Sequence, residues 1–162
     1  MSSIRAADAP AFDNYKTQHI YRGKPAEPQF RVGEDVYPNG VGQFRRTVTF
    51  QAEHGPNFAG HYTLARWSCG SGCSGIVIVD SLTGKLYGGM PFRVVAIPFL
   101  PEDLEPYLFR LDSRLFIAQG YFDIDVPDDS SECSRRYYEW TGASFKLLQK
   151  VVLKCSAVPQ RE

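Results

Sequence analysis

Apolar and polar residues alternate along short stretches of the chain from about residue 60 onward, a pattern typical of half-buried β-strands. β-Branched and aromatic residues are frequent in these stretches, and glycine, serine, threonine and proline separate them. The turns at 81–84 and 141–144 are short enough to join strands as hairpins, so we expect a mostly antiparallel sheet of about six to eight strands. The stretches predicted as strands are 60–67, 76–79, 85–87, 93–99, 115–126, 135–140 and 145–153.

A different period occurs between residues 39 and 55. Apolar residues there lie three or four positions apart, as on one face of a helix: Val41, Phe44, Val48 and Ala52. Asn39 suits a helix N-cap, and Gly55-Pro56 would end the helix. Alternation over 47–50 leaves a strand as the alternative, and we favour the helix. One helix covering an antiparallel sheet makes the expected fold class α+β.

Residues 1–38 form an irregular lead-in, with prolines at positions 10, 25, 28 and 38 and aromatic residues between them. Such a segment is expected to wrap over a domain surface rather than to fold alone. We therefore expect 1–38 to be an N-terminal extension packed on the body and 39–162 to be a single α+β domain. A length of 162 residues fits one domain.

The aromatic run at residues 137–140 fits a strand with two different faces. Tyr138 and Trp140 would point to one side of the strand and Tyr137 to the other. We expect one of these sides to face the core and the other to be exposed, which explains the run without a ligand.

Charge excludes some classes of partner. The chain has 18 basic and 18 acidic residues, so it lacks the excess positive charge that would attract nucleic acid or anionic membranes. No apolar run approaches the ~20 residues that cross a bilayer. Met1 to Arg5 lead directly into polar sequence, and we expect that a native export signal has been removed. The expected location is periplasmic or secreted, with another protein of the cell envelope as partner.

Four cysteines form two separate pairs, which favours a disulfide framework and an oxidising compartment. If the turn is at 141–144, residues facing each other across the hairpin have numbers that add up to about 285. Cys133 and Cys155 add up to 288, so a disulfide between them is geometrically available. The alternative is a pair of buried thiols.

Cys69 and Cys73 flank Gly70, Ser71 and Gly72. A disulfide between these cysteines would close a loop of three residues, and either it only holds a hairpin together or it stiffens a loop that binds a partner. A redox or metal role is disfavoured, because redox dithiols use a two-residue spacer at a helix N-terminus and tetrahedral metal sites need two more ligands. We take residues 69–73, together with His61, as the candidate partner-binding site.

Other chemistry is weakly indicated. His61 lies near Cys69 in the sequence, so a cysteine hydrolase is an alternative, although a disulfide would remove the nucleophile. The sequence contains no phosphate loop, dinucleotide fingerprint, nucleophile elbow or zinc-protease motif, and we expect no cofactor. An acidic cluster is a weak calcium candidate that lacks the glycine of the twelve-residue calcium loop. Its members are Asp123, Asp125, Asp128 and Asp129.

Four segments carry a resemblance: GPNFAGHY at 55–62, WSCGSGC at 67–73, LDSRL at 111–115 and YYEWTG at 137–142. With these segments, and over roughly residues 20–155, the chain resembles a family of small exported bacterial proteins of unassigned function. The order of helix, strand, cysteine loop and strand is also similar to the Ivy-type inhibitors of vertebrate lysozyme. The inhibitors' loop carries a histidine between its cysteines, whereas this loop has only glycine and serine.

These patterns together predict an exported, non-enzymatic binding protein. It would be an inhibitor or immunity protein that uses the disulfide-closed loop of residues 69–73. The alternatives are a small envelope hydrolase with a site centred on His61, and a structural or small-ligand-binding module.

Overall fold

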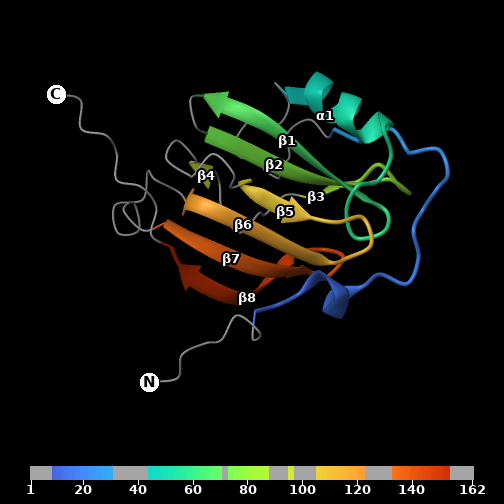
Figure 1. Ribbon diagram of the computed structural model, residues 1–162. Helices are drawn as coiled ribbons and strands as arrows, with labels where there is room; N and C mark the ends of the chain where they lie inside the picture. The colour runs from blue at the N-terminus through green and yellow to red at the C-terminus, as the bar shows by residue number, and fades with distance from the viewer. Residues whose placement is uncertain are drawn as a thin grey trace.

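The computed structural model describes residues 9–30, 44–70, 73–87, 95–96, 105–122 and 133–153. Within these residues an antiparallel sheet of eight strands is accompanied by one α-helix and one 3₁₀ helix, so the α+β class and the antiparallel sheet are confirmed (Figure 1). The helices are η2 (Phe12–Tyr15) and α1 (Arg45–Glu53). The strands are β1 (Tyr62–Gly70), β2 (Cys73–Asp80), β3 (Leu86–Tyr87), β4 (Val95–Ala96), β5 (Tyr107–Phe109), β6 (Leu115–Phe122), β7 (Cys133–Trp140) and β8 (Phe145–Val152).

The strand order is β1-β2-β4-β6-β7-β8, while β3 pairs with β2 and β5 with β6. The predicted hairpin of β7 and β8 is confirmed with its register, since Trp140 faces Phe145. A bulge at Tyr137/Tyr138 shifts the remaining pairs by one residue. The three-residue strand β5 was not predicted, because so short a stretch carries no readable alternation. The predicted strand 93–99 is described only at Val95–Ala96.

The sheet is strongly curled, and its inner face encloses an aromatic core. Tyr62 of β1 and Trp140 of β7 belong to strands that are not neighbours, yet their ring centroids are 5.3 Å apart. Phe58, in the turn before β1, is fully buried among the rings of this core. Ring pairs at such distances stabilise beyond their buried area, by about 0.5–1.5 kcal/mol each.

Both ends of the sheet are also covered on the outer face. Helix α1 packs Val48 and Ala52 against β1 and β2, with Phe44 stacked on Trp67 at 5.1 Å. The predicted helix is therefore confirmed over Arg45–Glu53, and the strand alternative for 47–50 is wrong. The helix ends at Glu53, with His54 as its C-cap, just before Gly55, whose φ is +88°, as the sequence indicated. The predicted cap, Asn39, lies outside the described residues.

The outer face of β6 and β7 is covered as well, which corrects one expectation. Tyr137 is only 6% exposed and packs with Leu115, Ile117 and residues of the N-terminal segment, here residues 9–30. Both sides of the run at 137–140 are therefore buried, not one. Alternation could not reveal this, because the covering residues are far away in the sequence.

The N-terminal segment runs past one end of the sheet, from the side of β8 to the side of α1 (Figure 1). Its backbone is mostly irregular but is hydrogen-bonded to the body at several places. The amide of Tyr21 donates to the carbonyl of Gly60 at 2.8 Å, and the amide of Gln29 donates to that of Gly84 at 2.8 Å. The Tyr21 bond, together with that from the amide of Thr17 to the carbonyl of Asp112 at 3.0 Å, fixes residues 16–19 beside the start of β1.

The outer edge of β1 is closed by two side-chain amides in place of a neighbouring strand. Asn57 Oδ1 accepts from the amide of Leu64 at 2.7 Å, and its Nδ2 donates to the carbonyl of the same residue at 3.3 Å. Gln51 makes the equivalent pair of bonds with Arg66, at 3.0 and 2.7 Å. This arrangement satisfies an edge that would otherwise be open to pairing with another chain.

Candidate functional site

The hairpin loop proposed for partner binding lies at the far end of β1. Gly70 pairs with Cys73, while Ser71, Gly72 and the side chain of Cys69 lie outside what the structure describes. His61 immediately precedes β1, whereas Cys69 is near its end, so about 25 Å of strand separates them. The structure therefore does not bring His61 and the cysteine loop into one site. A cysteine hydrolase that pairs these residues is incompatible with this separation.

The second cysteine pair is described at one member. Cys133 begins β7 and is disulfide-bonded. The amide of Leu153 donates to the carbonyl of Cys133 at 2.8 Å, which brings the chain just before Cys155 alongside β7. Cys155 itself lies outside the described residues, so this pairing stays a prediction.

The calcium candidates Asp123, Asp125, Asp128 and Asp129 also lie outside the described residues. In the part of the chain that the structure describes, no group of three or more histidine, cysteine, aspartate or glutamate side chains is arranged to hold a metal ion.

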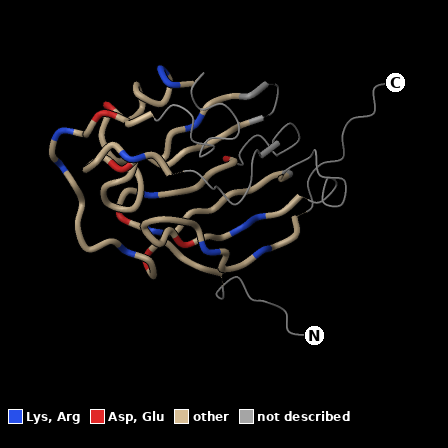
Figure 2. Tube along the Cα trace, turned by 180° about the vertical axis from the view of Figure 1, so that it is seen from behind, with Lys and Arg blue, Asp and Glu red and all other residues tan. Residues whose placement is uncertain are grey.

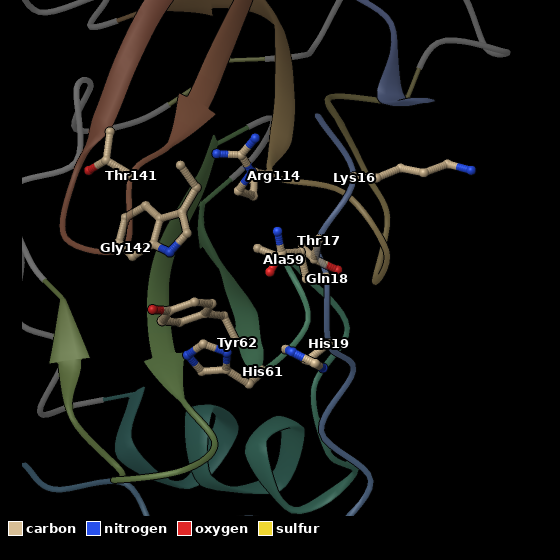
Figure 3. Close-up of a pocket in the computed structure, with 11 residues that line it drawn as sticks. Lys16, Thr17, Gln18, His19, Ala59, His61, Tyr62, Arg114, Thr141 and Gly142 are labelled. Carbon is tan, nitrogen blue, oxygen red and sulfur yellow. The ribbon is translucent and has the colours of Figure 1, made fainter. Parts of the chain in front are cut away.

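A pocket of about 480 Å³ lies where the N-terminal segment meets the curled sheet (Figure 3). Four parts of the chain form it: the N-terminal segment, the turn into β1, the start of β6, and the end of β7 with the turn after it. The residues that line it are Lys16, Thr17, Gln18, His19, Ala59, His61, Tyr62, Arg114, Trp140, Thr141 and Gly142. We call this the His61 pocket.

His61 is held on the wall of the pocket by its neighbours. Its ring lies against that of Tyr62, with centroids 4.1 Å apart. Its Nε2 is 3.9 Å from Oδ1 of Asp80, too far for a hydrogen bond. That oxygen already accepts from the amide of Leu82 at 2.8 Å. The side chain of His61 is 32% exposed and can therefore meet a ligand.

Two polar atoms of pocket residues are buried without a hydrogen-bond partner: Thr17 Oγ1 and Trp140 Nε1. Trp140 is 1% exposed, and an indole N–H can only donate. Burial raises the pKa of the Tyr62 phenol. The nearby indole of Trp140 acts to lower this pKa, and the charges of Asp80 and Tyr87 act to raise it. The phenol and the indole nevertheless do not meet in hydrogen-bond geometry. The pocket is therefore bordered by a buried donor that has no hydrogen-bond partner among the described residues.

Cationic side chains border the pocket. Arg114 Nη1 lies 3.5 Å from Glu139 Oε1, and the arginine side chain is 42% exposed. Figure 3 shows the side chain of Lys16 extending away from the other lining residues. Elsewhere basic and acidic residues occur side by side over the described trace, in keeping with the zero net charge (Figure 2).

Of the pocket residues, the sequence singled out only His61 as a candidate. Arg114 and Trp140 lie in segments that carried the family resemblance, and that was the available signal for them. Thr17 and His19 lie in the irregular segment, where no motif marks them. The pocket joins residues that are more than a hundred positions apart, which a pattern of neighbouring residues does not reveal.

Comparison of the chain with protein-family models, with curated proteins and with solved structures gave no significant match. No helix among the described residues is long and apolar enough to span a bilayer. The geometry of the His61 pocket therefore provides the basis for a function.

Proposed function

We propose that the protein is a binding protein that holds a small ligand in the His61 pocket. The observation that carries this proposal is the indole N–H of Trp140, which is buried at the pocket without a partner. An unsatisfied buried donor costs about 1–3 kcal/mol, and a ligand oxygen that accepts from it would remove that cost. The volume also suits a small molecule, because ligand pockets usually measure about 300–1,000 Å³.

Binding is favoured over catalysis by the residues that line the pocket. The described lining residues include neither serine nor cysteine, so a serine or cysteine hydrolase is disfavoured at this site. His61 and Asp80 are too far apart to share a hydrogen bond, so the pair does not form a hydrogen-bonded catalytic dyad in this structure. Aromatic walls with a few converging polar groups are typical of a binding site.

The proposal also includes the location of the protein, whereas a protein partner is treated separately. We propose an exported, periplasmic or secreted protein, and the disulfide at Cys133 supports an oxidising compartment. Inhibition of, or immunity against, another envelope protein through residues 69–73 stays a separate prediction. The His61 pocket is at the other end of β1, so ligand binding does not depend on that loop.

The two tryptophans of the chain provide the experiment. Trp67 packs under α1 and Trp140 lines the pocket, so ¹⁵N-labelled protein should give two indole N–H signals in separate environments. The conservative variant Trp67→Phe assigns them. Titration with a library of anionic, neutral and cationic fragments should shift the Trp140 signal, downfield where an acceptor binds, and leave that of Trp67 in place. The proposal is wrong if no fragment moves the Trp140 signal.

A further inference from the structure

The His61 pocket presents hydrogen-bond donors and positive charge to its contents. None of its described lining residues is aspartate or glutamate, whereas Arg114 and Lys16 are cationic. The Lys16 side chain extends away from the other lining residues, so Arg114 supplies the positive charge at the cavity. Trp140 adds a donor that cannot accept, and Thr17 adds a buried hydroxyl that has no partner. A ligand that matches this lining must carry acceptors and negative charge.

We infer that the ligand of the His61 pocket is a small organic anion whose oxyanion group, carboxylate or phosphoryl, faces Arg114 and accepts a hydrogen bond from Trp140. This inference rests on the proposed function, because it names the chemical class of the ligand in that same pocket.

Neighbouring backbones bring the two donors together. The amide of Trp140 donates to the carbonyl of Arg114 at 2.9 Å, so the guanidinium and the indole start from adjacent backbone positions, just before β6 and at the end of β7. An arginine has five N–H donors in a planar fork that matches an oxyanion with two bonds. Its contact with Glu139 is long, at 3.5 Å from Nη1, and leaves this fork largely available.

The positions of the acidic groups indicate which end of the pocket holds the charged group of the ligand. Asp80 lies behind His61, is only 7% exposed and does not line the pocket. Its charge disfavours an anion at the His61 end. Figure 3 shows His61 and His19 at one end of the pocket and Arg114 toward the other. Glu139 lies close to the Arg114 end, 3.5 Å from Nη1, but there the guanidinium offsets its charge. The oxyanion therefore belongs at the Arg114 end, and the uncharged part of the ligand lies along Tyr62 toward the two imidazoles.

The test compares probes of one shape and different charge. Benzoate, phenyl phosphate and benzamide are titrated into the ¹⁵N-labelled protein, and the Trp140 indole signal is followed. We expect the anions to bind at least about tenfold more tightly than benzamide, since a hydrogen bond to a charged group is stronger than a neutral one. The relative affinities of benzoate and phenyl phosphate distinguish a carboxylate ligand from a phosphoryl one.

Arg114→Gln and Arg110→Gln form a matched pair of variants. The two arginine side chains are similarly exposed, 42% and 44%, and each is paired with a carboxylate. Arg110 does not line the pocket, and its Nη2 bonds Asp112 at 2.6 Å. Arg114→Gln should weaken binding of the anions by roughly tenfold to a hundredfold. Arg110→Gln should leave it unchanged, and circular dichroism should show both variants folded.

The outcomes separate this inference from the proposed function. If benzamide binds as tightly as benzoate, or if both variants retain full affinity for the anions, the ligand is not an anion held by Arg114, although the pocket still binds ligands. If anions, neutral compounds and cations alike leave the Trp140 signal unmoved, the inference and the proposed function fail together.

Discussion

The side-chain amides that close the edge of β1 allow a quantitative test of the fold. Asn57 and Gln51 form the same pair of bonds with the backbone of β1, but in different surroundings. Leu64, the partner of Asn57, is 1% exposed, whereas Arg66, the partner of Gln51, is exposed. Replacing each amide by alanine therefore compares the loss of one bonding pattern at a buried and at an exposed residue of β1.

The expected difference follows from solvation. Asn57→Ala removes the acceptor at 2.7 Å from the Leu64 amide and leaves this part-buried amide without its partner, which costs about 1–3 kcal/mol. The bond to the Leu64 carbonyl is longer, 3.3 Å, and adds less. We expect a total loss of about 2–3 kcal/mol. Gln51→Ala should cost about 1 kcal/mol or less, because water replaces the amide at Arg66.

Urea unfolding followed by far-ultraviolet circular dichroism measures both values. The midpoint should fall with little change in the slope, because a change at one edge barely alters the surface exposed on unfolding. Thermal unfolding should show a decrease of about 4–12 °C for Asn57→Ala, given about 2–4 °C per kcal/mol at this chain length. Equal losses for the two variants, or a loss below about 0.5 kcal/mol for Asn57→Ala, would refute the role of burial.

Two further predictions concern backbone contact and pH. Gly60 and Gly55 both have positive φ, +90° and +88°, but a Cβ on Gly60 would collide with the carbonyl of His19, whereas the nearest atom to one on Gly55 is Pro25 Cγ at 3.9 Å. Gly60→Ala should therefore lower the urea midpoint more than Gly55→Ala, and equal effects would show that the contact is unimportant. Burial raises the pKa of Tyr107 to about 12. The neutral phenol therefore contributes about 2–3 kcal/mol to the unfolding free energy, which is complete below about pH 10 and is lost by about pH 12. Tyr107→Phe should flatten the decline in unfolding free energy measured from pH 8 to 11, and an unchanged decline would contradict the assignment.

Local patterns were sufficient to predict the elements that depend on neighbouring residues. Trp140 and Phe145 were placed opposite each other because the period of a strand and the length of one turn determine the register. Helix α1 was predicted from Val48 and Ala52, which are four positions apart and are both buried. In each case the residues that determine the structure lie within one hairpin or one helix.

The remaining features depend on contacts between distant parts of the chain. The curl of the sheet brings Tyr62 to Trp140, and no alternation of residues encodes the amount of that curl. One side of the run at 137–140 was expected to be exposed, because the N-terminal segment that covers Tyr137 has no repeating pattern. The His61 pocket was missed as a cavity for the same reason, since it forms only after the sheet and this segment have assembled.

The His61 pocket is complete only when the N-terminal segment is docked on the sheet. Residues 16–19 form one wall of the pocket, and the amide of Tyr21 holds this wall through the carbonyl of Gly60. The amide of Gly60 in turn donates to the carbonyl of Leu111 at 2.7 Å, three residues before Arg114. If the segment detaches, the pocket loses a wall and Thr17 is removed from it. A ligand that requires the closed pocket binds only the docked form, so its binding free energy adds to the stability of docking. The irregular lead-in is therefore a part of the binding site as much as of the fold.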